Sequence, residues 1–472
     1  MEKYNIAFTG VFDIENYGDH LFPLVFSEMM KEKKVDCELF LFSPIGNVEQ
    51  GYGQKRPIYP LHKMQELHDL YRFDAVIVGG GGILHYSSGK QMLNDELQTV
   101  VDYRVFETWV IPSMFAYKNK VKLIWNLPGG YQDFDFFYRP LTRLLCNNVD
   151  YLNTRDLYSK KILTACGISE EKIYTCLDSG FLIRKLYTKE CMKDIQKNIF
   201  TSEKYIVFHA NVHLDKGELP GVVSNLYELK QKGYDIVLLP IAYTHNDQLI
   251  LNKINEYSIG QYGEAGRFIM LGNSLNMLDI MSVLACCKMY IGVSFHGAVT
   301  ALSFSNIAIG YDYMRNGKTK DLFETLNLSD YYITNADDMN QAIEYALKSD
   351  LDIRLDEKIS DIDKHFDNIC NVLHEPYKEK NSEKFYIELS QTIFELNSFY
   401  DEYQKYEGLV ERYNDLDQLA RATHIQYETL KNEYNELNCR YQEVSQRLEY
   451  VEKKLEKVKN TVFYKGYKKF KK

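Results

Sequence analysis

His296 is the residue of this chain whose type and neighbours best suit proton transfer. An imidazole exchanges its proton near neutral pH, and this one stands between Phe295 and Gly297. The missing side chain of Gly297 would let a ligand approach the backbone, and Ser294 is suited to cap a helix that starts there. We predict that His296 is a catalytic acid or base, with Ser294 and Gly297 bordering the ligand. The alternative is a core histidine with both nitrogens hydrogen-bonded.

Two cations follow other expected strands and would suit an anionic ligand. Arg155 closes a short strand at 151–156, and Lys318 belongs to a polar stretch, 315–320, that also contains Arg315 and Lys320. Guanidinium and ammonium groups bind carboxylate and phosphate through charge-assisted hydrogen bonds. We predict that Arg155 and Lys318 hold an anion, and that Asp312 also contributes to substrate binding. The alternatives are a structural ion pair for Arg155 and a solvated loop for the later cations.

Two further loops follow apolar runs in the first half of the chain. The first contains Asn16, Gly18 and Asp19, and the second is a run of four glycines at 79–82 that includes Gly80 and Gly81. Successive glycine N–H groups can form an anion-binding nest. Neither loop has the spacing of a dinucleotide fingerprint or of a P-loop. These five residues are therefore predicted to line a substrate cleft, or alternatively to serve as cap, turn and packing residues.

Histidines 209, 213 and 245 raise the question of a metal site. They lack the close ligand spacing and the acidic cluster that a protein metal centre needs, so no metal and no bound cofactor is expected. The nine cysteines are scattered without C-x-x-C spacing, which favours a reducing compartment over a disulfide framework.

The elements that must position these residues alternate between apolar strands and helices, and the pattern occurs twice. This predicts an α/β protein with two doubly wound, Rossmann-like domains that face each other across a cleft. The expected boundaries are 1–187 for the first domain and 188–377 for the second. In parallel sheets ligands bind at the carboxyl ends of the strands, which is where the candidate residues fall.

The region 378–472 has a different pattern. From Tyr406 to Val458 apolar or small residues recur at alternating spacings of three and four, over more than seven heptads. This predicts a long α-helical coiled coil and a homo-oligomer; the alternative is a single amphipathic helix packed on the domains. The last residues, 463–472, alternate lysine with aromatic residues and suit either an anionic membrane surface or a solubilising end.

Composition and net charge exclude some classes of function. The chain has 472 residues, 45% of them hydrophobic, and a formal net charge of −10. Acidic balance argues against a nucleic-acid partner. The chain enters a strand at Tyr4, and no apolar run approaches the length of a membrane span. We expect a cytoplasmic protein, with contact at the inner face of the membrane through the basic tail as an open alternative.

These residues together resemble the polysaccharide pyruvyl transferase family over roughly residues 4–345. The resemblance lies in the loop from Gly10 to Asp19, the strand and glycine run from Val76 to Leu84, the pair Arg155-Asp156 and the motif 294–297 with its following helix. It implies two Rossmann-like domains similar to GT-B glycosyltransferases. Many members carry arginine two places before the motif histidine, where this chain has Ser294, a form also found in a subgroup of the family.

The resemblance implies transfer of a pyruvyl group from phosphoenolpyruvate, a donor substrate, to two hydroxyls of a glycan acceptor. His296 would then be the acid or base, while Arg155 and Lys318 would hold the anions. Two other functions remain open from the residues: a nucleotide-sugar glycosyltransferase using the same cleft, and a non-catalytic scaffold for glycan assembly. Ser294 favours the scaffold slightly, because serine cannot form a bidentate clamp on an anion.

Overall fold

The first sheet of the computed structural model is built from five parallel strands in the order β3-β2-β1-β4-β8. The structure describes residues 3–46, 56–94, 99–130, 132–243, 246–272, 274–315, 317–348 and 355–459. Side chains alternate along β1: Ile6 and Phe8 enter one buried cluster and Ala7 enters another, so both faces are covered. The strands are β1 (Tyr4–Thr9), β2 (Cys37–Ser43), β3 (Ile58–Pro60), β4 (Ala75–Val78) and β8 (Lys122–Trp125).

Helices and short strands surround this sheet to form the first lobe. Its main helices are α1 (Tyr17–Glu32), α2 (Met64–Tyr71), α3 (Glu107–Lys118), α4 (Arg139–Asn147) and α5 (Leu157–Ala165). Smaller strand pairs extend it: β5 (Gly81–Leu84) with β9 (Pro128–Gly130), β6 (Ser88–Asn94) with β7 (Thr99–Arg104), and β10 (Asn153–Thr154) with β11 (Tyr174–Thr175). After them come the 3₁₀ turn η4 (Ser179–Leu182), α6 (Ile183–Leu186) and α7 (Lys189–Gln196).

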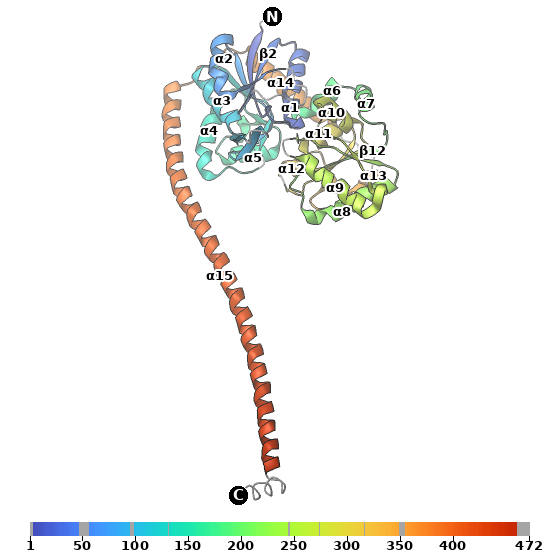
Figure 1. Ribbon diagram of the computed structural model, residues 1–472. Helices are drawn as coiled ribbons and strands as arrows, with labels where there is room; N and C mark the ends of the chain where they lie inside the picture. The colour runs from blue at the N-terminus through green and yellow to red at the C-terminus, as the bar shows by residue number, and fades with distance from the viewer. Residues whose placement is uncertain are drawn as a thin grey trace. The chain divides into compact units, whose positions relative to one another are not determined.

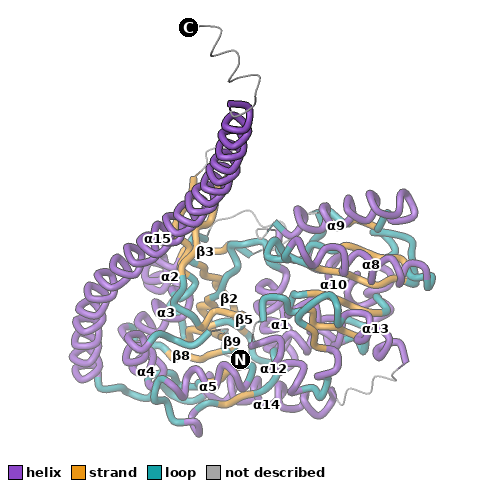
Figure 2. The backbone as a smooth tube through the Cα atoms, turned by 90° about the horizontal axis from the view of Figure 1, so that it is seen from below, coloured by secondary structure: helices purple, strands orange, loops and turns teal. Residues whose placement is uncertain are grey.

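The second sheet has six parallel strands in the order β14-β13-β12-β15-β16-β17. They are β12 (Tyr205–His209), β13 (Asp235–Leu238), β14 (Ile269–Met270), β15 (Met289–Gly292), β16 (Ile307–Tyr311) and β17 (Tyr332–Ile333). Helices α10 and α11 lie on the face toward α1, and α8, α9 and α13 lie on the other face (Figures 1 and 2). The helices are α8 (Leu219–Gln231), α9 (Asp247–Tyr262), α10 (Met277–Cys286), α11 (Phe295–Ser303), α12 (Gly317–Thr325) and α13 (Met339–Lys348). The predicted α/β class with two parallel sheets is confirmed.

Each sheet reverses its strand order at one central strand. In the first sheet β1 lies between β2 and β4, and in the second β12 lies between β13 and β15. Loops leaving the carboxyl ends of neighbouring strands diverge at such a point and leave a crevice for a ligand. The segments that follow β1, β4 and β15 carry most of the predicted site residues.

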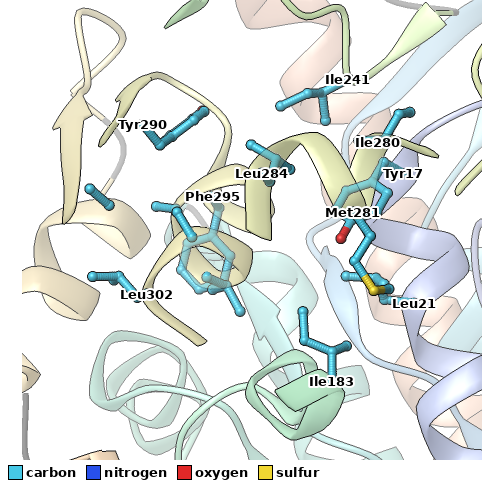
Figure 3. Packing of buried hydrophobic residues seen from close by; sticks show 14 of the residues in the cluster. Tyr17, Leu21, Ile183, Ile241, Ile280, Met281, Leu284, Tyr290, Phe295 and Leu302 are labelled. Atoms are coloured by element: carbon cyan, nitrogen blue, oxygen red, sulfur yellow. The ribbon is translucent and has the colours of Figure 1, made fainter. Parts of the chain in front are cut away.

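The two lobes are joined by packing and by backbone hydrogen bonds. Tyr17 and Leu21 of α1 pack beside Ile280 and Met281 of α10, in one cluster with Phe295 of α11 (Figure 3). The loop before α1 and the loop after β13 pair directly: the N–H of residue 17 donates to the carbonyl of residue 241 at 3.1 Å, and that of residue 243 donates to residue 15 at 2.9 Å. Main-chain hydrogen bonds therefore link the two lobes at this point.

Helix α14 (Leu355–His374) returns to the first lobe after the second sheet is complete. Its buried His365 lies 3.1 Å from Asn126 through Nε2 and 3.2 Å from the hydroxyl of Tyr151 through Nδ1. The predicted second domain, 188–377, includes this helix although its contacts lie with the first lobe. The expected boundaries at 187/188 and 377/378 stay predictions.

The final helix, α15 (Ser382–Lys459), is continuous over 78 residues (Figure 1). The chain divides into two units, Met1–Ile393 and Phe394–Lys472, so the first turns of α15 belong with the lobes. There Phe385 is buried and stacks on Tyr117 with ring centroids 3.7 Å apart. The structure shows a helix where a coiled coil was predicted, and the coiled coil itself stays a prediction.

The basic aromatic tail falls outside the described residues. Within the described residues, no helix is long and apolar enough to cross a membrane.

Candidate active site

The loop expected around His296 is the first turn of a helix. Helix α11 begins at Phe295, and the Ser294 hydroxyl accepts a hydrogen bond from the N–H of Gly297 at 3.2 Å. The N–H of Ser294 in turn donates to the Tyr290 hydroxyl at 3.1 Å. The predicted capping role of Ser294 is confirmed, and the helix starts earlier than expected because this cap satisfies its first turn.

His296 lies between the two lobes with 12% of its side chain exposed, and its Nε2 is 3.5 Å from Oδ2 of Asp178. Phe22 of α1 contacts it edge to face, with centroids 5.4 Å apart. A Cβ on Gly18 would come within 2.0 Å of the imidazole Nδ1, so only glycine fits there. Burial lowers the pKa of His296, and the nearby carboxylate of Asp178 opposes that shift.

Asp178 connects His296 to Arg155. Its Oδ2 accepts from a guanidinium N–H of Arg155 at 3.0 Å, and its Oδ1 accepts from the N–H of Gly180 at 2.8 Å. Burial alone would raise the pKa of Asp178, but His296, Arg155 and the Gly180 N–H together lower it to about 2. Asp178 is therefore ionised and orients the imidazole. Asp178 was not among the predicted site residues, although its position three residues after the strand at 174–175 was a usable signal.

Arg155 is a buried residue with two acidic partners. Besides Asp178, its Nε lies 3.4 Å from Oδ2 of Asp156, and its guanidinium lies 4.4 Å from the centre of the Phe295 ring. A Cβ on Gly129 would meet its Nε at 2.2 Å. The structural ion pair that was the alternative for Arg155 is present, so its positive charge acts on the site mainly through Asp178.

Asp19 and Lys318 form the second charged group of the site. Burial raises the pKa of Asp19 to about 7, although Lys318 and Arg155 oppose the shift. Burial and the charge of Arg155 lower the pKa of Lys318 to about 8, while Asp19 and Asp312 oppose the change. Gly81, with φ of +102°, leaves room for the Asp19 carboxylate, which a Cβ would approach to 2.9 Å.

The alternative for the later cations was a solvated loop, but the structure starts a helix at Gly317 within this polar stretch. Helix α12 begins at Gly317, and Lys318 in its first turn lines the cleft. Arg315 and Lys320 are exposed, and Lys320 lies 3.6 Å from Glu324 on the same helix. Of these three cations, only Lys318 lies in the cleft.

The remaining predicted substrate residues have structural contacts. Asn16 caps α1 by accepting from the N–H of Gly18 at 3.1 Å and also lines the cleft. A Cβ on Gly80 would meet the Phe22 ring at 2.2 Å, which favours the packing alternative for that glycine. Asp312 is buried at the end of β16 and accepts from the Tyr332 hydroxyl at 3.1 Å.

The cleft holding His296 and Lys318 has a volume of about 530 Å³ and extends over the carboxyl edge of the second sheet. Its wall includes His209, whose Nε2 is 2.9 Å from Oδ2 of Asp247. That oxygen also accepts from the N–H groups of Ile241 and Ala242. The pair thus holds the loop that joins the lobes. His245 lies outside the described residues.

His85 is a further residue that the sequence analysis missed. It follows β5, is 4% exposed and places its Nδ1 2.6 Å from the Ser87 hydroxyl. Burial and the charge of Lys318 lower its pKa to about 4. Its position directly after a strand was again the available signal.

The two α/β lobes each contain a parallel sheet, and charged residues lie where the strands of the two sheets end. This arrangement of two lobes is a GT-B-like fold. A UDP-GlcNAc 2-epimerase from Methanocaldococcus jannaschii superposes with a TM-score of 0.53 at 11% identity, covering 78% of this chain and 99% of that one. A UDP-N-acetylglucosamine 2-epimerase from Rickettsia bellii gives 0.50 at 13% identity, covering 79% and 96%. At this identity the likeness shows the fold alone.

The family follows from the sequence match. The polysaccharide pyruvyl transferase family model matches residues 16–313, and the chain belongs to that family. The amylovoran biosynthesis protein AmsJ of Erwinia amylovora is 22% identical over 285 residues, covering 56% of this chain. The match spans 63% of that relative's length.

Proposed function

We propose that this protein transfers a pyruvyl group from phosphoenolpyruvate to two hydroxyls of a sugar, forming a ketal during polysaccharide assembly. The observation that carries the proposal is the line of charges Arg155–Asp178–His296, which abuts a cleft that also contains Lys318. A buried imidazole beside an ionised carboxylate is suited to proton transfer. Family membership supports the same reaction class.

Two acceptor oxygens bond to C2 of phosphoenolpyruvate while the C2–oxygen bond to phosphate breaks. The C2–C3 double bond becomes a single bond as C3 takes one acceptor hydroxyl proton to become a methyl group, and the other hydroxyl proton leaves with phosphate. His296 lines the cleft and is the group placed to move a proton. The Asp19 carboxyl, whose pKa burial raises to about 7, interacts electrostatically with Lys318 and is a second ionisable group near it. Lys318 holds the anionic donor, and Arg155 with Asp178 positions His296.

The departure at Ser294 fits this assignment. Its hydroxyl is used to cap α11, so the positive charge for the donor comes from Lys318, helped by the N-terminus of α11, where unpaired N–H groups favour an anion. No contact in the described part of the site specifically favours the glycosyltransferase or the scaffold function over pyruvyl transfer.

The discriminating experiment is thermal unfolding with phosphoenolpyruvate and, separately, with a panel of nucleoside diphosphates. A ligand that binds only the folded state raises Tm by mass action. We expect a shift with phosphoenolpyruvate, its loss in Lys318→Ala, and phosphate release when sugar acceptors are added. A shift with one nucleotide and none with phosphoenolpyruvate would replace the proposal with a glycosyltransferase. An unchanged Tm with every ligand and no phosphate release would favour the scaffold.

A further inference from the structure

We infer that the acceptor sugar binds on a ledge of the second lobe formed by Asn211, Val212, His213 and Met314. This ledge lies in the loops that follow β12 and β16, and its four residues line the cleft that contains His296. The inference rests on the proposed function, because it names where the second substrate of that reaction sits.

The size and position of the cleft support a second substrate there. A volume of about 530 Å³ lies within the range of sites that hold ligands much larger than a three-carbon phosphate ester. The loop after β12 leaves the sheet at the point where its strand order reverses, which is the usual position of a ligand in such a sheet. In the proposed reaction Lys318 and His296 bind and protonate phosphoenolpyruvate at one end of the cleft. The ledge lies in the rest of the cleft and is therefore available to a second ligand.

The ledge is held in place before any ligand binds. The N–H of Asn211 donates to the Tyr313 hydroxyl at 2.9 Å, and that hydroxyl donates to the Asn211 side-chain oxygen at 3.0 Å. The same side-chain oxygen accepts from the N–H of His213 at 3.1 Å. One tyrosine thereby ties the two loops together, which reduces the ordering cost of binding.

The chemistry of the ledge matches a neutral sugar ring. Val212 is 47% exposed and Met314 is 42% exposed, although both lie in a cleft. Apolar side chains of this kind can cover the C–H face of a sugar, while the Asn211 amide and the His213 imidazole can hydrogen-bond its hydroxyls. None of the four ledge residues is a carboxylate, lysine or arginine, so the ledge favours hydroxyls over a second anion.

The test compares two ledge variants with a matched surface variant. We expect His213→Ala and Met314→Ala each to raise the KM for a p-nitrophenyl hexoside acceptor about tenfold or more, with the KM for phosphoenolpyruvate within twofold of native. Leu249→Ala removes a similarly exposed apolar side chain, 55% exposed on α9 of the same lobe, and should change neither value. The assay is phosphate release with each substrate varied in turn.

A direct binding measurement separates this inference from the proposed function. Saturation-transfer NMR with the same p-nitrophenyl hexosides reports binding whether or not turnover occurs, and the signal should be lost in both ledge variants. An unchanged acceptor KM, or undiminished hexoside signals in the variants, would overturn the ledge. Hexoside binding that needs the ledge, with no phosphate released from phosphoenolpyruvate, would overturn the proposed reaction and keep the sugar site. A nucleoside diphosphate signal that both ledge variants lose, with no hexoside signal in the native protein, would assign the ledge to a nucleotide instead.

Discussion

At the scale of single residues, the site is a row of charged side chains that shift one another's pKa values. Arg155 and His296 both contact one carboxylate, Asp178, whose pKa burial alone would have raised. Asp19, without such a paired contact, has its pKa raised to about 7 by burial. Environments that separate the pKa values of neighbouring acids assign them different tasks: Asp178 orients, and Asp19 holds a proton.

Replacing His296 with glutamine should lower kcat by about 10²-fold or more, because a positioned proton donor or acceptor contributes at least that much. Steady-state phosphate release measures the loss, and thermal unfolding should show that the variant remains folded. His62→Gln, at an exposed position of the first lobe, is the control and should keep native turnover. Native kcat in the His296 variant would remove this residue from the chemistry.

Asp19 should make stability depend on pH. An aspartate in the unfolded chain ionises near 3.9, whereas burial raises the folded pKa of Asp19 to about 7. The folded state holds this proton more tightly, so the stabilisation is full below about pH 4 and is lost as pH rises through about 7. Asp19→Asn should therefore raise Tm at pH 8 and change it little near pH 4, while lowering turnover.

Calorimetry across this pH range measures the effect. Asp235→Asn, at an exposed position, should follow the native chain at every pH. A Tm difference for Asp19→Asn that did not grow between pH 4 and pH 8 would contradict the raised pKa.

At the scale of elements, helix starts and glycines bring the site together. Helices α1, α11 and α12 begin within one to three residues of Asp19, His296 and Lys318. The first turn of a helix therefore fixes the position of each of these side chains. The glycines at 18, 81 and 129 leave space for His296, Asp19 and Arg155 respectively. A side chain at any of these three positions would occupy the space of a site residue.

Gly18→Ala tests this arrangement. A Cβ would lie 2.0 Å from the His296 Nδ1, so the imidazole must move, and a shift of about 1 Å can cost roughly 10²-fold in rate. The matched variant is Gly260→Ala in α9, where nothing lies within 4 Å of the added atom. That variant should gain about 0.5–1 kcal/mol in the free energy of unfolding and keep native kcat. Equal kcat in the two variants would show that Gly18 has no role in placing His296.

At the scale of the whole molecule, helix α15 has an apolar seam whose side chains repeat at the spacing of a coiled coil. Long helices obtain most of their stability from packing of such a seam. We expect a second copy of this chain to cover it as a coiled coil. Its described seam residues are 53–67% exposed, namely Leu437, Tyr441, Val444, Leu448, Val451 and Leu455.

The charges beside the seam favour a parallel pair. Arg440, Arg447 and Lys454 occupy the same flanking position of successive heptads. An antiparallel partner would bring these three basic residues against the same basic row. A parallel partner places Arg447 opposite Glu452 and Arg440 opposite Ser445, and leaves one like-charge pair, Lys454 with Lys459. Light scattering of the full chain should give twice the chain mass.

Cross-linking tests the orientation. In a chain with Cys191 and Cys439 replaced by serine, Val444→Cys should form a disulfide with its own counterpart under mild oxidation, because seam residues meet in a parallel pair. Gln446→Cys, on the opposite face of the helix, should not. Either a monomeric mass or equal cross-linking of the two variants would contradict the parallel coiled coil.

The sequence by itself determined the class of fold, the positions of most strands of the two sheets although not of the edge strands β3 and β17, the capping role of Ser294 and the long final helix. These features depend on local periodicity and on side chains that interact within a turn. Tertiary structure alone decided which charges meet: Asp178 stands 118 residues before His296 in the chain and lies 3.5 Å from it in space. It also decided that Gly80 packs against Phe22 and that Lys318, rather than Arg315 or Lys320, lies in the cleft. Burial and long-range pairing set these roles, and a linear pattern contains neither.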